Sequence, residues 1–211
     1  MSFDIFICGV GGQGLVLLTN VLGRACLKAG LKAVTGEMYG LSQRSGTVSV
    51  HMRIGEDAYS PLIPIGGADA LVALEAIEAL RYIEYLKKGG LALINKRVMH
   101  PPVETARIVK DRSRKYFTLE EVVSNIRRWT ERIAIIDALA IAKESGNPNV
   151  ENTVFLGCLS ALIELPLDPE KVKESIAEVV PSGTVEQNLK AFEAGMGKAT
   201  EALCGYGVCR G

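Results

Sequence analysis

The amino-terminal run Phe3–Gly14 constrains the fold most, because it joins a short apolar segment to a glycine-rich loop. Phe3, Ile5, Phe6 and Ile7 form an apolar run long enough for one buried strand, and Leu15–Lys28 then follows the three- and four-residue spacing of a helix. The order strand, glycine turn, helix is typical of the entry to a nucleotide-binding α/β domain.

The glycines of this loop match a known phosphate-binding spacing. Gly9, Gly11 and Gly14 follow G-x-G-x-x-G, in which the first permits a tight turn, the second a close backbone approach and the third close helix packing. The free N–H groups at the start of the helix would bind a phosphate or a carboxylate. Gly12 and Gln13 favour a ligand or a protein partner against the loop, although a tight turn without a ligand has the same pattern.

The rest of the chain alternates between strand-like and helical patterns up to about residue 137. Strands are predicted at 31–37, 47–54, 69–74, 91–95 and 133–137, with an extended edge strand returning over 59–65. Helices are predicted at 15–30, 75–88 and 116–129, the last introduced by a capping box at Thr118 and Glu121. From 138 the pattern is helical to the end, with breaks at 146–148, 166–169 and 181–183.

These elements predict an α/β fold: a Rossmann-like, mostly parallel sheet with an antiparallel hairpin insertion and a helical carboxyl-terminal portion. The chain shows neither an internal repeat nor a low-complexity linker. We therefore expect a single domain over residues 1–211, with an α/β core over about 1–140 and the helical portion over about 141–203.

Composition excludes several classes of function. The 24 basic and 24 acidic residues give no net charge, which argues against nucleic acid as the main partner. No run approaches the roughly 20 apolar residues that cross a membrane, and the first strand begins at once without a signal peptide. We expect a cytoplasmic protein, and its 48% hydrophobic content favours a surface covered by another subunit. Its five cysteines lack the closely spaced set of four that an iron–sulfur cluster needs; Cys204 and Cys209 flank a glycine-rich tail.

Several polar side chains are candidates for chemistry. Glu37 lies about twenty residues beyond the glycine loop, where an NAD(P)-dependent oxidoreductase has its ribose-binding acid. The following residues, 38–46, form a polar loop rather than a crossover helix, which argues against that class. Within this loop Arg44, with Ser45 and Gly46, could pair with a phosphate or carboxylate, or be a solvated arginine. The mid-strand position of His51 is more typical of a structural histidine than of a catalytic base. Cys8 is more typical of a small buried apolar residue than of a reactive thiol.

No pattern of a stand-alone catalyst is visible. The sequence lacks a Ser-His-Asp set, a G-x-x-x-x-G-K-[ST] loop and an H-E-x-x-H motif. We therefore expect a binding subunit rather than an independent enzyme.

Two segments taken together carry a family resemblance. The loop GVGGQG at 9–14 and the segment EMYGLSQRSGTVSVHMR at 37–53 resemble the gamma domain of 2-oxoacid:ferredoxin oxidoreductases. Within that family, the YGLSQRSG form is most similar to the beta subunits of the indolepyruvate-type enzymes. The likeness is dense across residues 5–66 and continues loosely through 69–95.

The resemblance implies a subunit that is inactive alone, in a complex that oxidatively decarboxylates aryl 2-oxoacids to acyl-CoA and reduces ferredoxin. It implies that thiamine diphosphate, magnesium and the iron–sulfur clusters belong to a larger alpha subunit, in a heterodimer or a two-alpha, two-beta assembly. It also implies a shared coenzyme A site, with contacts at the Gly11–Gly14 turn and the Arg44-Ser45-Gly46 loop. Two alternatives stay open: an NAD(P)-dependent Rossmann oxidoreductase and a non-catalytic regulatory or structural partner.

Overall fold

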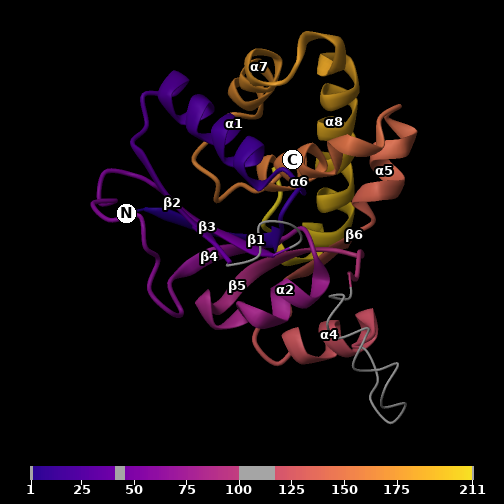
Figure 1. Cartoon of the computed structure of the whole chain (residues 1–211). Coiled ribbons are helices and arrows are strands. Elements are labelled where there is room, and N and C mark those ends of the chain that lie inside the picture. The colour runs from indigo at the N-terminus through magenta and orange to yellow at the C-terminus, as the bar shows by residue number, and fades with distance from the viewer. Residues whose placement is uncertain (1, 41–45, 100–116, 211) are drawn as a thin grey trace.

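The chain folds around one mixed β-sheet. The structure is a computed structural model and describes residues 2–40, 46–99 and 117–210, apart from the side chain of Cys204. The sheet has six strands in the order β2-β3-β1-β4-β5-β6 (Figure 1). In chain order they are β1 (Phe3–Val10), β2 (Ala33–Tyr39), β3 (Thr47–Ile54), β4 (Ala68–Ala73), β5 (Leu86–Asn95) and β6 (Ile133–Ile136).

Strand directions confirm the predicted sheet. β1, β4, β5 and β6 are parallel neighbours, while β3 pairs antiparallel with both β1 and β2. The hairpin therefore consists of β2 and β3, inserted beside the first parallel strand. The predicted fold class, a mostly parallel sheet with an antiparallel hairpin, is confirmed.

Helices cover both faces of the sheet (Figure 1). One face carries α1 (Leu15–Lys28) and the carboxyl-terminal helices, and the opposite face carries α2 (Ala76–Arg81) and α4 (Leu119–Ile126). The carboxyl-terminal helices are α5 (Ala138–Glu144), α6 (Glu151–Ser160), α7 (Pro169–Val179) and α8 (Val185–Leu203), joined through short 3-10 turns at Pro148–Val150 and Ser182–Thr184, with a third at Cys204–Tyr206. The first and third breaks fall where the sequence predicts them, whereas the second begins earlier than the predicted 166–169, because α6 already ends at Ser160 and α7 begins at Pro169. No helix in the described ranges is long and apolar enough to span a membrane.

The predicted edge strand over 59–65 is wrong. Pro61 and Pro64 lack the N–H groups that a ladder requires, and β2 already occupies the free side of β3. The segment instead lies against β3, because the Ile63 N–H donates to Nδ1 of the buried His51 over 3.0 Å. Residues 59–65 therefore form an irregular cover at this side of the sheet.

The predicted helix over 75–88 is too long. The helix α2 covers only Ala76–Arg81, a 3-10 turn follows at Ile83–Tyr85, and β5 begins at Leu86. Leu86 pairs with Ala68 of β4, so ladder bonds override the helical spacing of this stretch. The helix predicted over 116–129 is α4 (Leu119–Ile126), and its capping box is confirmed: the Thr118 hydroxyl accepts from Glu121 N–H while the Glu121 carboxylate accepts from Thr118 N–H.

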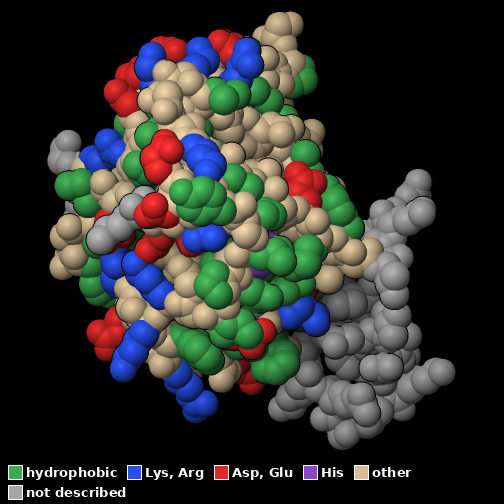
Figure 2. Space-filling model, turned by 90° about the vertical axis from the view of Figure 1, so that its left-hand side faces the viewer, with side chains coloured by type: hydrophobic (Ala, Val, Ile, Leu, Met, Phe, Trp, Pro, Cys, Tyr) green, Lys and Arg blue, Asp and Glu red, His purple; other side chains and the backbone are tan. Residues whose placement is uncertain are grey.

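Strand β2 forms one edge of the sheet, and its surroundings expose apolar side chains. Figure 2 views the molecule from this side and shows hydrophobic groups interspersed with charged ones. Large exposed hydrophobic residues of β2 and of segment 59–65 are Met38, Tyr39, Tyr59, Leu62 and Ile65. Tyr59, 85% exposed, is approached by the Lys32 ammonium at 4.4 Å from its ring centre.

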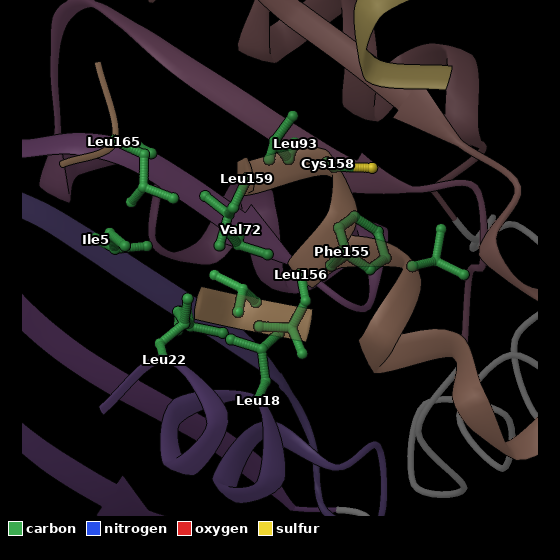
Figure 3. Packing of buried hydrophobic residues seen from close by; sticks show 14 of the residues in the cluster. Ile5, Leu18, Leu22, Val72, Leu93, Phe155, Leu156, Cys158, Leu159 and Leu165 are labelled. Atoms are coloured by element: carbon green, nitrogen blue, oxygen red, sulfur yellow. The ribbon is translucent and has the colours of Figure 1, made fainter. Parts of the chain in front are cut away.

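Alternation along the strands divides the core in two. Ile5 and Ile7 of β1 face the layer of α1 and α6, whereas Phe6 and Cys8 face α2 and α4. Figure 3 shows the first of these clusters, in which Leu18 and Leu22 of α1 approach residues of α6 over the sheet. All of α6 from Asn152 to Ser160 is buried, so this helix is the centre of the layer that α1 and the carboxyl-terminal helices form on one face of the sheet.

Candidate functional site

The glycine loop connects β1 directly to α1. Gly12 and Gly14 both adopt positive φ values, 95° and 77°, that side chains other than glycine rarely accept. Gly14 is the N-cap of α1, no side chain of the described residues caps this end, and the first turn contains no acidic residue. The start of α1 therefore keeps N–H donors available for an anion.

The Gln13 side chain is used inside the fold. Its Oε1 accepts from Val10 N–H over 2.8 Å, and its Nε2 donates to the Leu74 carbonyl over 3.0 Å. Gly9 lies beneath this amide, where an added Cβ would stand 2.6 Å from Gln13 Oε1. Gln13 and Gly9 thus shape the loop from within, while Gly12 is exposed at its tip.

The two motifs of the resemblance lie side by side. β1 and β3 pair so that Val10 stands opposite Thr47, and Gly11 N–H donates to the Gly46 carbonyl over 2.9 Å. The middle of the second motif, at Gly46 and Thr47, is thereby fixed against the glycine loop. Arg44 and Ser45 lie outside the described residues.

A cleft of about 440 Å³ opens beside the glycine loop. It is lined by Gly11, Gly12, Gln13, Gly14, Leu74, Asn95, Arg97, Met99, Pro148, Asn149 and Glu151. Most of these residues lie at or just after the carboxyl ends of β1, β4 and β5, and the others come from the turn at Pro148–Val150 and the start of α6. After β1 the chain turns to α1 on one face, and after β4 it turns to α2 on the other. The cleft therefore lies at the topological switch point, where open α/β sheets bind their ligands.

Polar groups from β5 and α6 form the wall opposite the loop. The buried Asn95 donates through Nδ2 to the Leu74 carbonyl (3.1 Å) and to Glu151 Oε2 (3.2 Å). Arg97 Nη1 donates to Glu151 Oε1 over 2.7 Å. Asn152 Nδ2 donates to the Gly14 carbonyl over 3.1 Å, so α6 also supports the glycine loop.

Sequence reasoning did not identify this second wall. A signal was available, because Asn95 ends the predicted strand 91–95 and Arg97 closely follows it, and the carboxyl end of a parallel strand should meet that of β1. The contributions of Glu151 and Asn152 depend on how α6 packs, which no local pattern reveals.

The backbone that carries Arg97 is fixed on several sides. Ala76 N–H donates to the Arg97 carbonyl (2.9 Å), and Met99 N–H donates to Glu75 Oε1 (2.8 Å). Glu75 is 1% exposed and also caps α2 through Glu78 N–H. Burial raises the pKa of the Glu75 carboxyl, while the bond from Met99 N–H acts in the opposite direction.

The dinucleotide interpretation of Glu37 does not agree with the sheet order. In a dinucleotide fold the acid ends a strand adjacent to β1, but here the antiparallel β3 separates β2 from β1. Two strand spacings, about 9.5 Å, therefore separate Glu37 from β1. The Glu37 carboxylate is exposed and accepts a hydrogen bond from the Tyr39 hydroxyl.

His51 and Cys8 have the structural environments that the sequence favours. His51 is 1% exposed, its Nδ1 accepts from Ile63 N–H, and its ring packs edge-on against Phe6 and Tyr85. Burial lowers the pKa of His51 and raises that of the Cys8 thiol, with Glu78 and Glu75 adding to the second shift. Cys8 is therefore a protonated thiol at neutral pH.

Two further features of the described residues bear on the choice of site. Within the described ranges, no group of three or more His, Cys, Asp or Glu side chains is arranged to hold a metal ion. A larger hollow of about 530 Å³ lies between α1, β2 and α7 and includes the Arg24–Glu178 ion pair. It contains no residue of the glycine loop, so we assign the candidate site to the smaller cleft.

Comparisons with known proteins agree on one family. A family model described as pyruvate ferredoxin/flavodoxin oxidoreductase matches residues 4–198. Indolepyruvate oxidoreductase subunit IorB of Thermococcus kodakarensis is 42% identical over 203 residues, which cover 96% of this chain and 98% of the relative. The subunit of the same name from Archaeoglobus fulgidus is 41% identical over 199 residues, covering 94% and 96%. The crystal structure of keto/oxoacid ferredoxin oxidoreductase gamma subunit from Geobacter sulfurreducens PCA has a TM-score of 0.70 at 25% identity, covering 96% and 98%.

Proposed function

This chain belongs to the pyruvate ferredoxin/flavodoxin oxidoreductase family, and on that premise we propose that it is the small subunit of an indolepyruvate-type 2-oxoacid:ferredoxin oxidoreductase. The complex would oxidatively decarboxylate aryl 2-oxoacids to acyl-CoA and pass the electrons to ferredoxin. The observation that carries the proposal is identity above 40% to IorB subunits over nearly the whole of both chains.

The role of this chain in the complex is to bind part of coenzyme A in the switch-point cleft. The uncapped start of α1 offers backbone donors, the exposed Gly12 lets a ligand approach the main chain, and Arg97 adds a guanidinium. These groups suit the phosphates of coenzyme A. Gly46 is hydrogen-bonded to Gly11, which supports a contact of Gly46 with the same ligand. The resemblance implies that Arg44 and Ser45, which lie outside the described residues, contribute to this site as well.

Thiamine diphosphate, magnesium and the iron–sulfur clusters belong, in this proposal, to a larger alpha subunit. When bound there, thiamine diphosphate would supply the carbanion chemistry of decarboxylation. The present chain would bind and orient the acyl acceptor. The exposed apolar residues of β2 and of segment 59–65 support a docking surface for such a partner, because removing exposed apolar side chains from water is favourable.

The test is co-expression of this chain with a candidate large subunit, followed by an assay of indolepyruvate-dependent ferredoxin reduction. We expect activity only when both chains and coenzyme A are present, because neither chain holds the complete site. Robust turnover by this chain alone would contradict the proposal, as would a complex whose activity is indifferent to coenzyme A. Titration of this chain with NADH and NADPH is the control, and saturable micromolar binding would instead support the dinucleotide alternative.

A further inference from the structure

We propose that Glu151 is a resident counter-ion of Arg97, and that a phosphate of the ligand must compete with Glu151 for the guanidinium. This inference rests on the proposed function and adds a residue that sets the affinity of the same cleft. Arg97 and Glu151 both line the cleft, and the contact between Arg97 Nη1 and Glu151 Oε1 is 2.7 Å.

The Glu151 carboxylate is firmly held on the cleft wall. Its side chain is only 15% exposed, and Asn95 Nδ2 donates to the oxygen that Arg97 does not contact, over 3.2 Å. Asn95 is itself fixed by its bond to the Leu74 carbonyl. The negative charge therefore stays in the cleft whether or not Arg97 contacts it.

The Arg97 guanidinium is free to change partners while its backbone remains in place. Lys96 N–H donates to the Ile136 carbonyl (2.8 Å) and Ala76 N–H donates to the Arg97 carbonyl (2.9 Å), so the main chain is fixed on both sides. The side chain is 40% exposed and makes a single-pronged contact to the carboxylate. A contact of this kind is weaker than the two-pronged pairing that a phosphate can make with arginine.

The pair thus determines the charge that an incoming anion meets. With Glu151 in contact, the guanidinium is neutralised, and a ligand without phosphate gains little from Arg97. A phosphate binds the Arg97 guanidinium only if it displaces the Glu151 carboxylate, so Glu151 lowers the affinity for phosphate-bearing ligands. Removing the negative charge should consequently tighten coenzyme A binding, provided that Arg97 is present.

The experiment measures the dissociation constant of coenzyme A for the assembled complex by calorimetry. The variants are Glu151→Gln, Arg97→Gln and the double variant, with Glu164→Gln as the matched control. Glu164 forms an ion pair with Arg132 at 3.0 Å and is not among the residues that line the cleft. Glu164→Gln therefore removes one negative charge from an ion pair outside the cleft. Gln at position 151 keeps the shape of Glu and an oxygen for Asn95, so folding should be retained.

We expect Glu151→Gln to bind coenzyme A roughly fivefold more tightly than the wild type, as expected for release of one partly exposed ion pair. In the Arg97→Gln background, Glu151→Gln should change the logarithm of the dissociation constant of coenzyme A by less than about half as much as it does when Arg97 is present. Unchanged or weaker binding by Glu151→Gln would overturn the inference. Equal tightening with and without Arg97, or in Glu164→Gln, would also overturn it, because repulsion alone would then explain the result. A wild-type complex that binds no coenzyme A would contradict the proposed function itself.

Discussion

His51 shows how a single buried side chain links β3 to the irregular segment above it. Its Nδ1 accepts the Ile63 N–H, so the proton of the neutral ring is on Nε2, which has no hydrogen-bond partner among the described residues. Protonation would charge a ring that is surrounded by Phe6 and Tyr85 and would remove the acceptor. His51 therefore ties the stability of this region to pH.

Stability should fall below about pH 6.5 because of this residue. Since burial lowers the folded-state pKa of His51, the unfolded chain binds the proton first as pH decreases, and the unfolding free energy declines by at most about 1.4 kcal/mol per pH unit. Denaturant unfolding of the wild type and of His51→Gln between pH 7 and 5 checks this. Gln keeps an acceptor but does not titrate, so the difference between the two curves isolates His51 from Glu75, whose raised pKa acts in the opposite direction. Parallel curves would contradict the assignment.

At this scale, local pattern predicted the glycine loop well and the opposite wall poorly. The loop follows from short-range constraints, such as the positive φ of Gly12 and Gly14. Asn95, Arg97 and Glu151 are brought together by strand order and by the packing of α6, which are long-range properties. Arg44 and Ser45, which the sequence suggests as anion ligands, lie outside the described residues.

At the scale of elements, the contact between α6 and α8 depends on two glycines that let the helix backbones touch. A Cβ at Gly157 would stand 2.0 Å from the Phe192 carbonyl oxygen, and a Cβ at Gly195 would stand 2.1 Å from that of Val154. Rotating a side chain could not relieve either clash, because the obstructing atoms belong to the backbone. Since α6 also carries Glu151 and Asn152, this contact positions one wall of the cleft.

Gly195→Ala should therefore destabilise the chain by about 3 kcal/mol, the upper range for overpacking in a core. Gly197 is the matched control: it is exposed on the same helix, and a Cβ there meets nothing within 4 Å. Gly197→Ala should raise the unfolding free energy by about 0.5–1 kcal/mol, since alanine favours the helix. Thermal or denaturant unfolding of both variants tests this, and similar effects of the two substitutions would refute the proposed role of the close contact.

Element prediction succeeded where one local signal dominated and failed where pairing decided the outcome. The capping box at Thr118 and the breaks between the carboxyl-terminal helices are set by short-range chemistry. The stretch 75–88 has helical spacing, yet pairing with β4 turns its last part into β5. The proline-containing segment 59–65 looks extended, but the free side of β3 belongs to β2.

At the scale of the whole molecule, the inserted hairpin distinguishes this fold from a dinucleotide-binding one. Its strand β3 separates β2 from β1, which moves Glu37 away from the position where an acid would bind a ribose. The same strand brings Gly46 and Thr47 of the second motif beside the glycine loop. The sheet thus offers a cleft with donors on the loop side and an arginine–glutamate pair on the other. This arrangement suits a phosphate-bearing acceptor that is shared with a partner subunit.

The most direct test of this account is the steady-state kinetics of the reconstituted complex that contains Arg97→Gln. If this chain binds coenzyme A and the partner performs the oxidation, the KM for coenzyme A should rise by about tenfold, the effect of losing one charged hydrogen bond to phosphate. The KM for indolepyruvate and the kcat at saturating coenzyme A should remain at their wild-type values. An unchanged KM for coenzyme A, or a loss confined to kcat, would contradict the assignment of the cleft.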